Sequence, residues 1–118
     1  MKNIYPSTGN FIAMIANENS QLFLHSLDFD SCAKNIASFN MILPENIAPL
    51  SASDHLNYWE FGLNAIMVSD TAYFRNQNYH KKSDTIDTLD IAKMEYVLEL
   101  VISGIKNIAK VKESKVII

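Results

Sequence analysis

The sequence contains few of the residues from which familiar sites are built. Cys32 is its single cysteine, so the chain cannot form an internal disulfide or a cysteine-based zinc cluster. It has only three glycines, at positions 9, 62 and 104, and therefore no glycine-rich phosphate loop, which excludes the kinase and dehydrogenase classes. The H-E-x-x-H pair of helical zinc sites and the G-x-S-x-G turn of serine hydrolases are also absent.

An excess of basic charge is missing too. Ten basic residues stand against thirteen acidic ones, a formal net charge of -3, so no affinity for nucleic acid is expected. No apolar run is long enough to cross a bilayer, and no membrane partner is expected. The 118 residues, 48% of them hydrophobic, are typical of one soluble globular domain. Residues 1–9 lack the features of a signal peptide, so the chain as it stands is expected to be cytoplasmic.

Hydrophobic patterning predicts strands that alternate with helices. The nearly continuous apolar run at 10–16 is typical of a central strand that is buried on both faces. A looser helical spacing, capped by Asn19 or Ser20, predicts a helix from Ser20 to about Asn35. The next segments are a strand at 36–43, a loop at 49–53, a short helix at 53–61 that Ser53 caps and Gly62 ends, and a strand at 65–68.

The last third of the chain combines an irregular segment with a long helix. Residues 70–84 are rich in polar and tyrosine side chains, and long loops of this kind tend to carry function. Asp87 or Thr88 begins a helix that runs to about Lys110. Its apolar residues recur at three and four positions and predict one amphipathic face: Met94, Val97, Leu98, Val101, Ile105 and Ile108.

This pattern predicts an α/β fold in which helices cover a largely parallel or mixed sheet, a partial three-layer α/β/α arrangement. Three strands make a thin sheet, however. A strand that is apolar on both faces needs neighbours on both edges and cover on both sides. The chain is therefore interpreted as a single partial domain, residues 1–118, in which part of the fold is missing.

Two stretches in the second half of the chain form a signature. Their residues are Ser53-Asp54-His55, Trp59, Gly62-Leu63-Asn64-Ala65, Asp70-Thr71-Ala72, Phe74-Arg75-Asn76, Tyr79-His80 and Asp84-Thr85. In order and spacing they resemble the C-terminal part of the co-catalytic di-zinc aminopeptidases, metallopeptidase family twenty-eight, which includes bacterial leucyl aminopeptidases and is related in fold to glutaminyl cyclases. The residues from Gly9 to Ala13 resemble a strand of the same family, so the resemblance spans nearly the whole chain. Asn64 and Gln77 depart from it, because the family has proline at both positions.

The resemblance implies roles for four residues. His80 corresponds to a zinc ligand, and Tyr79 to a residue beside the metal that helps to polarise the substrate carbonyl or lines the pocket. Met67 and Phe74 could form a wall of the substrate pocket, although core packing is the commoner role of such residues near a strand. The family's other zinc ligands and its general base lie N-terminal to the matched part, so the resemblance implies that the partial domain 1–118 lacks its N-terminal half. A lone imidazole supplies one of the roughly four bonds that zinc needs, so the isolated chain is not expected to hold the metal.

Structural roles are expected for the other polar residues of the signature. Asp54 and His55 are expected to stabilise the start of a short helix. Arg75 is expected to pair with a nearby carboxylate such as Asp70. The remaining acidic and hydroxyl residues are expected to hydrogen-bond to the loop backbone and to cap the final helix: Asp84, Thr85 and Asp87.

Two functions remain open at this point. The chain resembles the C-terminal portion of a zinc aminopeptidase, which would be inactive alone and would act on peptide substrates only when completed by the missing half. That family is often secreted or periplasmic. The alternative is a noncatalytic interaction or assembly module, whose exposed strand edge packs on itself or on another chain. Both predict a homo-oligomer or a partner chain.

Overall fold

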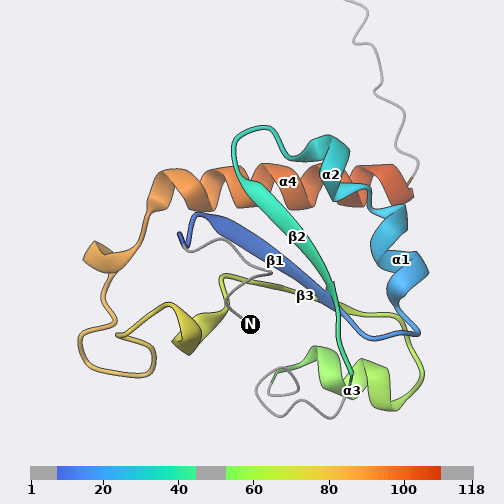
Figure 1. Ribbon diagram of the computed structural model, residues 1–118, viewed down its shortest axis with the longest axis horizontal. Helices are drawn as coiled ribbons and strands as arrows, with labels where there is room; N and C mark the ends of the chain where they lie inside the picture. The colour runs from blue at the N-terminus through green and yellow to red at the C-terminus, as the bar shows by residue number, and fades with distance from the viewer. Residues whose placement is uncertain (1–7, 45–52, 110–118) are drawn as a thin grey trace, which may run out of the picture.

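The computed structural model describes residues 8–44 and 53–109, which form a small α/β unit around a three-stranded mixed sheet (Figure 1). The strands are β1 (Phe11–Ala16), β2 (Ala37–Ile42) and β3 (Ile66–Ser69), in the order β2-β1-β3. β1 pairs with β2 in parallel and with β3 in antiparallel orientation. The α/β class, the mixed sheet and the central place of the first strand agree with the sequence-based predictions.

β1 is the centre of two hydrophobic clusters because all six of its residues are buried. Successive side chains of a strand point to opposite faces. Ile12, Met14 and Ala16 accordingly join a larger cluster with helical residues, whereas Ala13 and Ile15 pack with Trp59 in a smaller one. The helices thus form layers on both sides of the sheet (Figure 1).

The larger cluster is built by two short helices where the sequence predicted one. α1 spans Gln21–Ser26 and α2 spans Phe29–Cys32. The helix breaks at Asp28, whose backbone is left-handed with a φ of 50°, and this break lets both Leu24 and Phe29 enter the core. Ser20 occupies the position before α1 but makes no side-chain cap. Its hydroxyl accepts a hydrogen bond from the backbone N–H of Ala65 at 3.2 Å instead.

On the opposite face, α3 (His55–Glu60) is attached through Trp59. The indole Nε1–H donates to the carbonyl of Ala65 at 3.0 Å, and the ring meets the buried His55 edge-on, with centroids 4.5 Å apart. The helix ends before Gly62, which has a φ of +69° as expected of a helix stop. Asp54, not Ser53, precedes the helix, and neither caps it with a side chain. Most of the loop predicted at 49–53 lies outside the described residues.

α4 (Ile91–Ala109) begins later than predicted, after a short 3-10 turn at Ile86–Thr88. Asp90 caps its first turn instead of Asp87 or Thr88, because its carboxylate accepts the backbone N–H of Lys93 at 3.1 Å. The packed face also differs from the predicted one. Leu100 and Gly104 are its buried residues, whereas much of the predicted apolar face is exposed, namely Met94, Leu98, Ile105 and Ile108. Among the described residues, no helix is both long and apolar enough to span a membrane.

Candidate functional site

The segment from Asp70 to Asp84 carries half of the signature residues and is shaped by its own hydrogen bonds. The Asp70 carboxylate accepts from the backbone N–H of Ala72 at 2.7 Å. The side-chain amide of Asn76 donates to Asp84 at 3.3 Å, and its oxygen accepts the backbone N–H of Asn78 at 2.9 Å. Asp84 thus bonds within the loop, but to a side chain and not to the backbone as predicted. Apart from the 3-10 turn at Ala72–Phe74 the loop has no regular structure. These contacts give it a defined path, which suits a segment that positions side chains.

Backbone strain is concentrated in the same loop. Thr71, Ala72 and His80 have positive φ angles of 73°, 45° and 57°, although none of them is glycine. Such conformations cost of the order of 1 kcal/mol or more each and persist where the surroundings enforce them. Strained residues of this kind cluster at binding and catalytic sites. The loop is therefore the strongest candidate region for function in the described part of the chain.

Arg75 fastens the loop to the start of β1. Its Nε–H donates to the Thr71 hydroxyl at 2.8 Å, and its Nη2 donates to the carbonyl of Phe11 at 3.0 Å. The guanidinium also lies 4.2 Å from the centre of the Phe11 ring. Partial burial lowers the pKa of Arg75, and the charge of Asp70 opposes that shift. The charge of the predicted partner Asp70 thus acts on Arg75. The hydrogen bonds of Arg75, however, go to a hydroxyl and a carbonyl, and its guanidinium contacts a ring.

Three of the four sequence-predicted site residues come together in one exposed aromatic stack, made of Tyr73, Phe74, Tyr79 and His80. The rings of Tyr73 and Phe74 stack with centroids 4.3 Å apart, and those of Tyr79 and His80 stack at 3.9 Å. Tyr73 joins the two pairs, because its ring lies 6.1 Å from that of Tyr79. Phe74 is 62% exposed and His80 is exposed as well. The stack offers flat apolar surface next to an imidazole that can bind a metal or a proton.

Met67, the fourth predicted residue, lies elsewhere. It is half-buried on β3 and packs against the smaller core cluster around Trp59. Its position is that of a core residue on the α3 side of the sheet. Met67 thus packs on the core, and its role in a substrate-pocket wall together with Phe74 stays a prediction.

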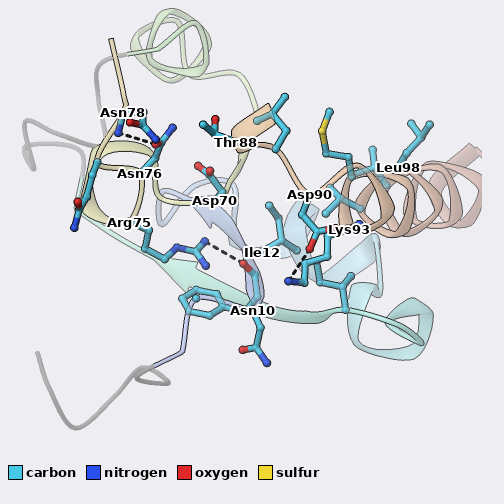
Figure 2. A pocket seen from close by; sticks show the side chains of 18 residues that line it. Asn10, Ile12, Asp70, Arg75, Asn76, Asn78, Thr88, Asp90, Lys93 and Leu98 are labelled. Carbon is cyan, nitrogen blue, oxygen red and sulfur yellow. Dashed lines mark hydrogen bonds and ion pairs between the residues drawn. The ribbon is translucent and has the colours of Figure 1, made fainter. Parts of the chain in front are cut away.

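A groove of about 920 Å³ lies beside Arg75, which is one of the residues that line it (Figure 2). Loop residues, among them Asn76 and Asn78, line one side of it, and α4 lines the opposite side from Lys93 to Val101. Ile12 of β1 lies between them, and Asp70 and Thr88 stand at the rim (Figure 2). Its polar end at Arg75 thus continues into an apolar wall along α4.

One ion pair lies on the α4 side of this groove. Lys93 Nζ lies 2.9 Å from the Asp90 carboxylate. The side-chain and backbone hydrogen bonds from Lys93 lower the pKa of Asp90. Sequence reasoning missed this groove and also Tyr73, the residue that joins the two ring pairs of the stack. The density of aromatic side chains at 73–80 was a signal for Tyr73, whereas the groove depends on how α4 packs.

A zinc centre of the kind implied by the resemblance needs more ligands than this region supplies. Within residues 8–44 and 53–109, no three side chains of histidine, cysteine, aspartate or glutamate are grouped so that they could hold a metal ion. His80 is therefore at most one ligand of a site. The donor set of the described residues does not fit a complete binuclear centre, and the remaining ligands would have to come from outside these residues.

Comparison with known proteins gives one informative match. The chain is 36% identical over 112 residues to the uncharacterized protein YfbL of Escherichia coli (strain K12). The match covers 91% of this chain but 33% of YfbL, so the chain spans about a third of the length of the curated relative. No protein-family model and no solved structure matches the chain. What the sequence and the comparison establish together is that this α/β unit also occurs within a considerably longer polypeptide.

Proposed function

We propose that this chain is the C-terminal portion of a zinc aminopeptidase of the co-catalytic di-zinc family, and that it contributes His80 as one zinc ligand and the aromatic stack as part of the substrate pocket. The unit hydrolyses N-terminal peptide bonds only when further polypeptide supplies the missing carboxylate and histidine ligands. Zinc, when bound there, would supply an activated water and polarise the peptide carbonyl.

The observation that carries the proposal is the strained and hydrogen-bonded loop around the signature. The motif residues of this loop are held by contacts with one another and with β1. Arg75 ties the loop to β1, Asn76 ties it to Asp84, and the left-handed backbone of His80 stacks its imidazole on Tyr79. A loop kept only as a connection would not need three non-glycine residues in left-handed conformations.

The chain's own residues would act mainly by positioning. Stacking on Tyr79 limits the rotation of the His80 ring, so the imidazole needs little reordering to bind a metal. The exposed faces of Phe74 and Tyr73 offer an apolar surface to the N-terminal side chain of a peptide. Tyr79 is close enough to the imidazole for its hydroxyl to approach a group bound there.

A chimera tests the proposal. In this chimera the matched third of YfbL is replaced by the present chain, and hydrolysis of aminoacyl p-nitroanilides is measured with and without added zinc. We expect zinc-dependent hydrolysis that His80→Ala lowers by more than about 100-fold, because loss of even an outer partner of a metal site costs about 10- to 100-fold. Zinc stoichiometry, measured by a chromogenic chelator, should fall in the same variant.

His25→Ala is the matched control, since His25 is an exposed histidine on α1 away from the loop. It should leave both hydrolysis and zinc content unchanged. A chimera that binds zinc but cleaves no aminoacyl substrate would refute the assigned activity. Full activity after His80→Ala would refute the assigned ligand, and an inert chimera without zinc would leave the noncatalytic assembly role as the better account.

A further inference from the structure

Five apolar side chains of α4 form an exposed stripe: Ile91, Met94, Leu98, Ile102 and Ile105. Their spacing of three and four residues places them on one side of the helix. Each is between 43% and 59% exposed. A single exposed leucine needs no explanation, but a continuous row along a helix of this length does.

The stripe lies next to the packed face of the helix and does not duplicate it. The core contacts of α4 come from Val97, Leu100 and Gly104, which turn toward α2 and β1. At about 100° per residue, the packed face and the stripe together cover roughly half of the helix circumference. Helices with so wide an apolar arc are normally covered on more than one side.

The stripe also runs into the groove beside Arg75. Met94 and Leu98 belong to both, and Figure 2 shows Leu98 on the helix side of the groove. The sheet is incomplete as well. Among the described residues β2 pairs only with β1, which leaves its outer edge without a partner strand, and the hydroxyl of Ser38 on β2 is buried without a hydrogen-bond partner. Stripe and groove thus form one uncovered surface, and the outer edge of β2 is a further uncovered part of the unit.

We infer that this surface is the docking site of polypeptide corresponding to the two thirds of YfbL that this chain does not match. The argument for that occupant is the length of the relative. YfbL holds the same unit, at 36% identity, within a polypeptide about three times as long. Domains bury the apolar faces of their helices against neighbouring layers, so the rest of such a polypeptide is the natural cover for α4. The inference stands without zinc or catalysis.

Co-purification tests this inference. The present chain and a tagged YfbL lacking its matched third are expressed together and purified in EDTA, so that metal binding plays no part. We expect a one-to-one complex by light scattering. Leu98→Glu with Ile102→Glu should weaken it at least about 30-fold, because charges in the centre of an apolar interface act at its hot spots. Both positions are exposed, and circular dichroism should show that the variant keeps its fold.

Lys106→Glu is the matched control, since it places the same new carboxylate on the polar side of α4, and it should leave the complex intact. A second measurement covers the case in which the truncated YfbL does not fold. Hydrogen exchange of α4 should be slower in the chimera described above than in the isolated chain, and the double variant should reverse this protection.

Three outcomes overturn the inference. The first is that neither a complex nor added protection of α4 is found. The second is a complex that the double variant does not weaken, which would place the contact elsewhere. The third is a stable homodimer of the isolated chain that the double variant dissociates, because the occupant of the stripe would then be a second copy. Loss of zinc-dependent hydrolysis with an intact complex would instead count only against the proposed function.

Discussion

Arg75 is the residue on which the candidate site depends most directly. Instead of one ion pair it makes three contacts, with the Thr71 hydroxyl, the Phe11 carbonyl and the Phe11 ring. A guanidinium can make all three at once because it is planar and carries several fixed donors. Gly9 makes room for it, since a Cβ at that position would lie 2.9 Å from Arg75 Cδ.

Replacing Arg75 by lysine should therefore loosen the loop although the charge is kept. We expect Arg75→Lys to lower the free energy of unfolding by about 1–2 kcal/mol, because hydrogen bonds of charged groups are worth about this much and lysine cannot reproduce the fork. Urea denaturation measures the loss, and hydrogen exchange should locate it at residues 70–84. Lys82→Ala, an exposed change in the same loop, is the control, and equal stability of the lysine variant would contradict this role.

At the scale of elements, the contact between α2 and α4 decides which side of α4 faces the core. Gly104 lets Phe29 approach so closely that a Cβ there would lie 2.5 Å from the ring atom Cε1. Phe29 is almost fully buried, so its ring has little room to yield. Gly104 therefore allows the ring to approach the helix closely, while its own backbone has an ordinary helical conformation.

Gly104→Ala should consequently destabilise the protein even though alanine favours helices by about 1 kcal/mol over glycine. Overpacking of a rigid core costs typically about 1–3 kcal/mol. We expect a net loss of about 1 kcal/mol in the free energy of unfolding, measured by urea denaturation. Adding Phe29→Leu should recover part of it, as a double-mutant cycle would reveal.

Gly62→Ala provides the comparison for this cycle. It should also destabilise, but for a different reason, because its φ of +69° disfavours a side chain while nothing lies within 4 Å of the new Cβ. Its effect should therefore add to that of Phe29→Leu without coupling. A Gly104→Ala variant more stable than the native chain would show that the helix can shift away from Phe29.

At the scale of the whole molecule, stability should depend on what covers α4. A ligand that binds only the folded state stabilises it by about 2.7 kcal/mol at a hundredfold excess over Kd. For a unit of this size, that corresponds to a rise in Tm of about 10 °C. The truncated YfbL should produce this rise in the native chain and none in the Leu98→Glu/Ile102→Glu variant.

Trp59 offers a specific signal for that measurement, because it is the only tryptophan of the chain and is buried against the sheet. Incorporation of fluorinated tryptophan gives one 19F resonance from this chain, and a truncated YfbL prepared without the label adds none. The loss of this resonance on heating then reports the melting of the present unit alone. An unchanged Tm at saturating partner concentration would argue against cover of α4 by that polypeptide.

The sequence by itself determined the elements that short patterns of neighbouring residues specify. The continuous apolar run of β1 has one explanation, burial on both faces, and the structure places it at the centre of the sheet. The long apolar periodicity of α4 and the polar, irregular loop before it were readable for the same reason, as was the stop at Gly62. Most of the candidate site lies in one short stretch, so Phe74, Tyr79 and His80 could be picked out from sequence alone, whereas Tyr73 was missed.

Only the tertiary structure decided what depends on contacts between distant segments. The helix breaks at Asp28 because Leu24 and Phe29 must both reach the core. No local sequence pattern predicts this break. The apolar residues of α4 outnumber those that its neighbours can cover, so periodicity could not tell the packed face from the stripe. Arg75 bonds to Phe11, 64 positions away, in preference to the nearby Asp70. All three features depend on how distant segments pack against each other, and a local sequence pattern carries no information on that packing.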